Sequence, residues 1–153
     1  MKNIAFESDK IIATAKNYYG NNLIALGIFG SVARNEKDHP GDLDIFILCE
    51  TLPEDILQRY RELRSVFSKI NKRCNFIAWT RKEFESKFSS IYLDLAVDTI
   101  ILYDSSNYLY EKFSRIRKII SEAGLYRKKL THSYMWKWKN QPKKWSIDWA
   151  GVT

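Results

Sequence analysis

The sequence predicts an α/β domain in which a mixed sheet of four or more strands carries helices mainly on one face and is followed by a C-terminal β-hairpin. Short apolar runs of strand length occur at residues 23–29, 43–49, 74–79 and 96–103. Longer segments with apolar residues at every third or fourth position separate these runs, which is typical of amphipathic helices. With 153 residues, 45% of them hydrophobic, the chain is long enough for one compact domain.

Helix boundaries are indicated by capping residues. One helix precedes the first strand. Thr51 and Glu54 form a capping-box pattern, which predicts that the helix after the second strand begins there. The last helix is predicted to begin at Asp104 or Ser105 and to end at Gly124, where glycine suits the left-handed conformation of a C-terminal cap.

The basic character of the chain is concentrated at its C-terminal end. The formal net charge is +7, and residues 125–153 hold seven lysines and arginines against the single acid Asp148. We therefore divide the chain into a main domain at residues 1–124 and a basic, tryptophan-rich C-terminal segment at residues 125–153 that packs on this domain.

The tail alternates aromatic and polar residues on both sides of a turn at residues 140–142, which predicts that residues 134–138 pair with residues 145–149 in a hairpin. Interleaved lysine and tryptophan residues are compatible with RNA binding through phosphate attraction and base stacking. The favoured alternative is that the tryptophans cover the sheet or a neighbouring subunit.

Several classes of protein are disfavoured. The longest apolar runs are shorter than a membrane span, and the first residues lack the apolar core of a signal peptide, so we expect a cytoplasmic protein that does not enter the membrane. The two cysteines, Cys49 and Cys74, lie in apolar stretches without zinc-ligand spacing, and we expect free thiols.

The candidate catalytic residues are two aspartates at the start of the second predicted strand. Asp42 and Asp44 are two residues apart, so a strand would point both carboxylates to the same side. Two carboxylates held this close repel each other unless a cation neutralises them. Mg²⁺ typically binds one or two carboxylates together with substrate phosphates, which makes Asp42 and Asp44 candidate metal ligands.

A glycine–serine turn supplies the other half of the pattern. Gly30 and Ser31 follow the first predicted strand and are separated from Asp42 by ten residues. Glycine permits a close backbone approach, and the amides of the turn, with the Ser31 hydroxyl, are candidate ligands for a terminal phosphate. Arg34 either adds positive charge near that phosphate or forms a salt bridge with Glu36 or Asp38.

These motifs resemble the signature of the polymerase-beta-type nucleotidyltransferase superfamily, and most closely its minimal nucleotidyltransferase branch. The resemblance extends over residues 23–104. It implies the polymerase-beta-like fold, two Mg²⁺ ions, ATP or another nucleoside triphosphate as substrate, and transfer of a nucleoside monophosphate to a protein or RNA hydroxyl. It also implies an antitoxin that pairs with a HEPN-type toxin and adds AMP to it.

One position departs from the family pattern. The third carboxylate of the family corresponds here to Asn75, whose amide cannot act as a carboxylate base at neutral pH. Asp94 or Asp98 would compensate if the fold brought either of them to the site. The alternatives to an active enzyme are a weak or inactive binding module that masks a partner protein and an RNA-binding protein that uses its basic tail.

Overall fold

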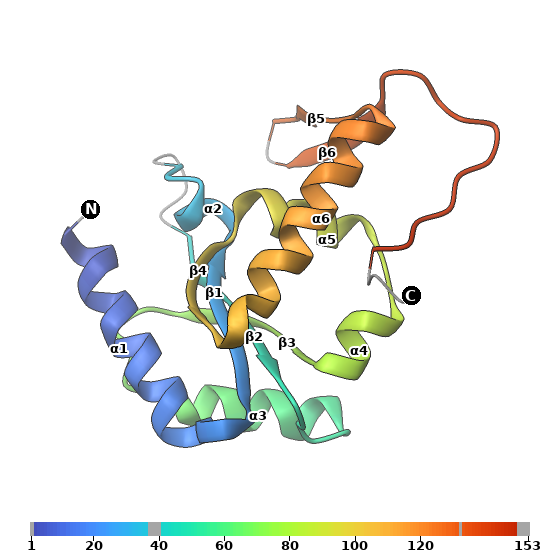
Figure 1. Cartoon of the computed structure of the whole chain (residues 1–153). Coiled ribbons are helices and arrows are strands. Elements are labelled where there is room, and N and C mark those ends of the chain that lie inside the picture. The colour runs from blue at the N-terminus through green and yellow to red at the C-terminus, as the bar shows by residue number, and fades with distance from the viewer. Residues whose placement is uncertain (1, 37–40, 132, 150–153) are drawn as a thin grey trace.

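The computed structural model describes residues 2–36, 41–131 and 133–149. Its helices are α1 (Lys2–Tyr19), α2 (Gly30–Ala33), α3 (Ile56–Val66), α4 (Arg81–Ser86), α5 (Ser90–Asp98) and α6 (Tyr108–Ala123), with single 3-10 turns η1 (Gly20–Asn22) and η2 (Ser105–Asn107) (Figure 1). Its strands are β1 (Leu23–Phe29), β2 (Leu43–Cys49), β3 (Cys74–Thr80), β4 (Ile100–Asp104), β5 (Leu125–Lys129) and β6 (Tyr134–Trp138).

Four of the strands form a mixed sheet in the order β3-β2-β1-β4. Strand β1 is antiparallel to both β2 and β4, whereas β2 and β3 are parallel. The predicted α/β class with a mixed sheet and a C-terminal hairpin is therefore confirmed. The register sets Asp44 opposite Phe29 on one side and opposite Asn75 on the other. This pairing brings the candidate site residues of β2 and β3 next to each other.

Helices cover both faces of the sheet, so the expectation that they pack mainly on one face is wrong. Helices α1 and α3 lie on one face, and α4, α5 and α6 lie on the other (Figure 1). The reason is visible in β2, where Ile45 and Ile47 belong to the first hydrophobic cluster and Phe46 and Leu48 to the second. A central strand that is apolar on both faces requires a helical layer on each of them.

The predicted start of α3 is wrong, and α6 begins at Tyr108, with Asn107 as its N-terminal cap residue, and not at Asp104 or Ser105. The predicted C-terminal cap of α6 at Gly124 is confirmed. Asp55, not Thr51, caps α3 by accepting hydrogen bonds from the first-turn amides. The Thr51 backbone is instead held by the side chain of Asn22 through two hydrogen bonds of 2.8 Å. Asp104 accepts from the amides of residues 109 and 110 at the start of α6, and Gly124 ends that helix at φ 69°.

Two predicted strands have different limits in the structure. The fourth strand begins at Ile100, because residues 96–98 continue α5, whose apolar residues pack against α6. The hairpin exists, but β6 pairs with β5 and not with residues 145–149. Trp149 is 4% exposed and packs its ring edge-to-face against Phe84 in the core. Residues 145–149 therefore form no strand: Trp149 fills the core, whereas Trp145 stays 43% exposed.

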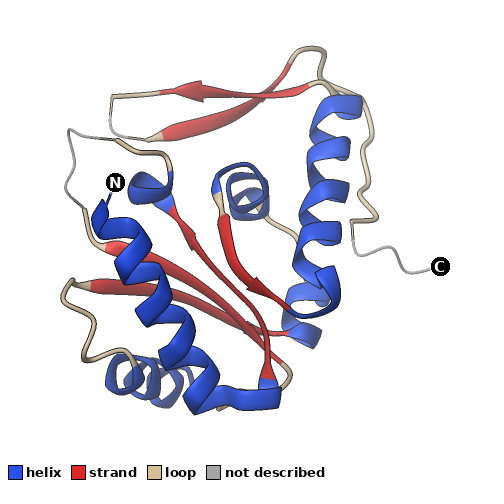
Figure 2. Ribbon diagram, turned by 60° about the vertical axis from the view of Figure 1, so that its left-hand side comes forward, coloured by secondary structure: helices blue, strands red, loops and turns tan. Residues whose placement is uncertain are grey.

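The hairpin extends from the end of α6 across the top of the domain toward α2 (Figure 2). The indole rings of Trp136 and Trp138 pack against the hydrophobic cluster that contains α5 and α6. Both cysteines are free thiols, with Cys49 buried and Cys74 half-buried. Within the described chain, no helix combines the length and the apolar character needed to cross a membrane.

Candidate active site

The two candidate aspartates lie where β2 begins. Asp44 is the second residue of β2, and Asp42 directly precedes the strand. Leu43 between them is 2% exposed and belongs to the core, so the alternation of the strand sends both carboxylates to the opposite side. The Asp42 side chain keeps 39% of its surface exposed. Solvent and ligands therefore reach this pair.

Asn75 connects the two carboxylates. Its side-chain nitrogen donates hydrogen bonds to Asp42 Oδ2 at 3.3 Å and to Asp44 Oδ1 at 3.2 Å. One nitrogen atom lies within hydrogen-bonding reach of both acids, so the carboxylates converge on a single point. The parallel register of β2 and β3 produces this contact, because it sets Asn75 beside Asp44.

The turn at Gly30 is packed directly against Asp44. Gly30 has φ +73°, a left-handed conformation that favours glycine, and a Cβ atom built on it would lie 2.0 Å from Asp44 Oδ2. Ser31 follows in α2, and its hydroxyl makes no hydrogen bond with any residue that the structure describes. Gly30 is therefore in close contact with Asp44, and the next residue along the chain carries an unengaged hydroxyl.

Burial raises the pKa of Asp44 above its ordinary value. Desolvation is the main cause, and the negative charge of Asp42 acts in the same direction. The hydrogen bond from Asn75 and the positive charge of Arg34 oppose the shift by stabilising the carboxylate. Ionisation of Asp44 therefore costs free energy in the folded protein, as expected of a carboxylate that a bound cation would neutralise.

The donors of the site are oxygen atoms, the ligands that a magnesium ion prefers. Among the described residues, no group of three or more His, Cys, Asp or Glu side chains is placed to hold a metal ion. The site offers two carboxylates and, if the Asn75 amide turns over, one neutral oxygen. This set fits an Mg²⁺ ion that takes the rest of its ligands from water and substrate phosphates.

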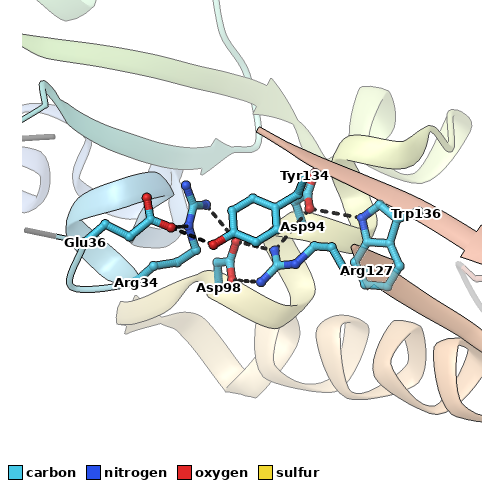
Figure 3. Close-up of polar contacts among 7 residues, drawn as sticks. All are labelled: Arg34, Glu36, Asp94, Asp98, Arg127, Tyr134 and Trp136. Atoms are coloured by element: carbon cyan, nitrogen blue, oxygen red, sulfur yellow. Dashed lines mark hydrogen bonds and ion pairs between the residues drawn. The ribbon is translucent and has the colours of Figure 1, made fainter. Parts of the chain in front are cut away.

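The side chain of Arg34 points toward Tyr134 of the hairpin (Figure 3). It donates to Glu36 at 2.7 Å and to Asp98 at 3.0 Å, and its guanidinium lies 4.9 Å from the centre of the Tyr134 ring. Of the two interpretations of Arg34, the salt bridge with Glu36 is therefore formed. Arg34 is nevertheless close enough to lower the pKa of Asp44, although it is the smallest of the four influences.

Asp94 and Asp98 do not stand in for the missing third carboxylate, because both are bound by the hairpin. Arg127 donates to Asp98 at 2.7 and 2.9 Å and to Asp94 at 3.2 Å, and Trp136 donates to Asp94 at 3.0 Å (Figure 3). Asp98 is shared by Arg34 and Arg127.

This hairpin clamp, formed by Arg34, Glu36, Asp94, Asp98, Arg127, Tyr134 and Trp136, ties the α2 turn to the C-terminal segment. Of its contacts, the sequence predicted only the pair of Arg34 and Glu36. A further local signal is the i, i+4 spacing of Asp94 and Asp98, which sets them on one helix face.

The ionisation of Glu36 should make the stability that the clamp contributes depend on pH. Hydrogen bonds from Arg34 and Tyr134 lower its pKa from the ordinary 4.5 to about 2. A carboxylate with a depressed pKa in the folded state stabilises the protein above its unfolded pKa, and this stability is lost as the pH falls through the folded pKa. We expect Glu36→Gln to lower the melting temperature at pH 7, with the difference from the wild type disappearing between pH 4.5 and about 2.

Thermal unfolding followed by circular dichroism at a series of pH values measures this difference. Glu54→Gln is the matched control, because Glu54 is exposed and has no hydrogen bond or ion pair with the described part of the chain. A Glu36→Gln difference that stays constant down to pH 2 would contradict the assignment.

The chain is similar in sequence and in fold to known proteins. The model of the family described as "Polymerase beta, Nucleotidyltransferase" matches residues 9–91, which include Gly30, Ser31, both aspartates and Asn75. The chain belongs to this nucleotidyltransferase family. The resemblance inferred from the Gly-Ser and Asp-x-Asp motifs is thus confirmed.

Relatives of this nucleotidyltransferase include a "Putative protein adenylyltransferase" of Methanocaldococcus jannaschii, which is 23% identical over 117 residues, 73% of this chain and 80% of the relative. Among solved structures, a toxin–antitoxin complex with AMP-PNP matches with a TM-score of 0.54 at 17% identity, covering 75% of this chain and 90% of the other. A complex of a tri-AMPylated Shewanella oneidensis HEPN toxin with an MNT antitoxin matches with a TM-score of 0.52 at 16% identity, covering 77% and 90%. At these identities, the solved structures show a shared fold.

Proposed function

We propose that the protein is a magnesium-dependent adenylyltransferase that transfers AMP from ATP to a hydroxyl group of a HEPN-type toxin and so acts as its antitoxin. The observation that carries this proposal is the convergence of Asp42 and Asp44 on one point beside the Gly30 turn. Two carboxylates next to a backbone turn form the arrangement that a metal-bound triphosphate requires.

Each residue has a role in the proposed reaction. Asp42 and Asp44 hold the metal, which when bound neutralises phosphate charge. Gly30 and Ser31 bind the terminal phosphates through backbone amides and the unengaged hydroxyl. Arg34 adds positive potential from its position in the hairpin clamp. The acceptor oxygen attacks the α-phosphorus, the bond to the β-phosphate oxygen breaks, pyrophosphate leaves, and the hydroxyl proton passes to water. The residues of the chain contribute positioning and charge neutralisation.

The choice of AMP and of a toxin protein rests on the names of the relatives. One relative is named for protein adenylylation, and one fold neighbour is a complex that contains an AMPylated HEPN toxin. We place the protein in the cytoplasm beside such a partner. RNA is the less favoured acceptor because the tryptophans of the basic tail are largely engaged, with Trp136 and Trp138 packed on the domain and Trp149 in its core.

The test is a transfer assay with ATP labelled at the α-phosphate, magnesium, and the HEPN protein with which this chain co-purifies or is co-expressed. We expect the label to appear on the partner and to be absent when magnesium is removed by EDTA. ATP labelled at the γ-phosphate is the control, because a nucleotidyl transfer leaves that label in pyrophosphate. A partner that carries the γ-label, or no label with either nucleotide, would refute the proposed reaction.

Asn75 gives a separate prediction about catalytic strength. We expect Asn75→Asp to increase AMP transfer about tenfold, because a third carboxylate strengthens metal binding. Without magnesium the same variant should be less stable than the wild type, since a third acid beside Asp42 and Asp44 replaces a hydrogen-bond donor. Its melting temperature should therefore rise more steeply with magnesium than that of the wild type.

Asn75→Ala is the matched control, since it removes the amide without adding charge. The same measurements also distinguish an active transferase from a protein that neutralises its partner only by binding to it. If wild type and Asn75→Asp bind ATP and the toxin but transfer nothing, the protein neutralises its partner by binding alone.

A further inference from the structure

A cavity of about 350 Å³ lies next to the candidate active site. It is lined by Arg64 at the end of α3 and by Arg73, Cys74, Asn75 and Phe76 at the start of β3. Asn75 is shared between this cavity and the acidic pair, because its amide contacts both Asp42 and Asp44. The cavity therefore borders the proposed metal site at Asn75 and at Arg73, whose guanidinium lies 3.7 Å from Asp42.

The charge of the cavity lining is positive. Its two charged residues, Arg64 and Arg73, are both exposed, and no acid belongs to the lining. Arg64 forms no hydrogen bond or ion pair with any residue that the structure describes. Arg73 approaches Asp42 at 3.7 Å, but its side chain is 84% exposed, and ion pairs of this kind contribute little. Both guanidinium groups are thus available to an anionic ligand.

We propose that this cavity, the arginine pocket, binds an acidic side chain of the acceptor polypeptide close to the hydroxyl that receives AMP. This inference rests on the proposed adenylyltransferase function and adds the substrate preference of the same site. Guanidinium groups bind carboxylates through paired, charge-assisted hydrogen bonds, which fix position as well as affinity. The bound carboxylate of the acceptor would hold the neighbouring hydroxyl, which receives AMP, beside Asn75 and the metal site.

A polypeptide fits this pocket better than RNA does. Proteins that hold single-stranded nucleic acid combine basic groups with exposed aromatic rings on which bases stack. The one aromatic residue in the lining, Phe76, is only 9% exposed, and its ring packs against Phe67 with centroids 5.4 Å apart. The pocket therefore offers charge without a stacking surface.

The test uses two synthetic peptides that share an acceptor tyrosine and differ only in its neighbours, which are glutamates in one and glutamines in the other. AMP transfer from α-labelled ATP is measured with the full-length protein. We expect the wild type to prefer the glutamate peptide, and Arg64→Glu to raise KM for that peptide about tenfold, the effect of losing one hydrogen bond to a charged group. KM for ATP should not change.

Arg61→Glu is the matched control, because Arg61 lies on the same helix and is exposed but does not line the pocket. Arg73→Gln should also raise KM for the peptide. Equal use of both peptides by the wild type, or an Arg64→Glu effect no larger than that of Arg61→Glu, would overturn the inference while leaving the adenylyltransferase intact. Labelling of an oligoribonucleotide that depends on Arg64 would overturn it in favour of RNA. If neither the peptides nor the HEPN partner is labelled, the proposed function itself fails, and the inference fails with it.

Discussion

Replacing Asp44 with asparagine should remove AMP transfer while leaving the protein folded. Asn has the same shape as Asp but no negative charge, so the variant loses the attraction for the metal and keeps the packing against Gly30. We expect activity to fall by at least about 10²–10³-fold, the usual effect of losing one preorganised electrostatic contact to the transition state. The α-labelled ATP assay measures this loss directly.

The stability of the Asp44→Asn variant, in contrast to its activity, should stay the same or increase. Burial raises the pKa of Asp44, which means that the folded protein holds this charge at a cost. Without magnesium, Asp44→Asn should melt at the same temperature as the wild type or higher, and magnesium should no longer raise its melting temperature. Asp9→Asn, on the exposed surface of α1, is the control for the chemical change alone. Undiminished labelling by Asp44→Asn would refute the metal-binding role.

The second large effect is expected at Gly30. An alanine there would need a left-handed backbone at φ +73° and would set a methyl group 2.0 Å from Asp44 Oδ2. The backbone conformation costs about 1–2 kcal/mol, and the steric overlap adds roughly 1–3 kcal/mol. Because Asp44 must move to relieve the overlap, we expect AMP transfer to fall about 10²-fold or more, the effect of a displacement of about 1 Å at a reacting centre.

Gly20→Ala separates these two causes. Gly20 also has a positive φ, +53°, but a Cβ atom there would meet nothing within 4 Å. We expect this control to lose about 1–2 kcal/mol in urea denaturation and to retain full activity. If Gly30→Ala were no less active than Gly20→Ala, the close packing of the turn against Asp44 would have no catalytic role.

Much of the candidate site could be predicted because its residues are close together along the chain. Gly30 and Ser31 directly follow one strand, and Asp42 and Asp44 lie at the start of the next, so an antiparallel pair is sufficient to bring them together. The Asn75 prediction needed one further step, the placement of a third strand beside the second. In the structure, Asn75 is opposite Asp44 in the parallel register.

The errors occurred where local patterns were ambiguous. Residues 96–98 are apolar enough for a strand but continue α5, because that helix packs against α6. The alternating residues 145–149 resemble a strand, yet Trp149 fills the core beside Phe84. Burial is only partial in both segments, since Val97 is 45% and Trp145 is 43% exposed. The partner that buries the remaining apolar residues decided the conformation of each segment.

The sequence by itself determined the family, the mixed sheet, and the meeting of the Gly-Ser turn with the two aspartates, because periodicity and short spacing act over neighbouring residues. Only the tertiary structure decided that helices cover both faces, that Arg127 and Tyr134 clamp the α2 turn through Asp98 and Glu36, and that Arg64 and Arg73 line one cavity with Asn75. These contacts join residues far apart in the chain. Their geometry depends on how whole elements pack, which no local pattern records.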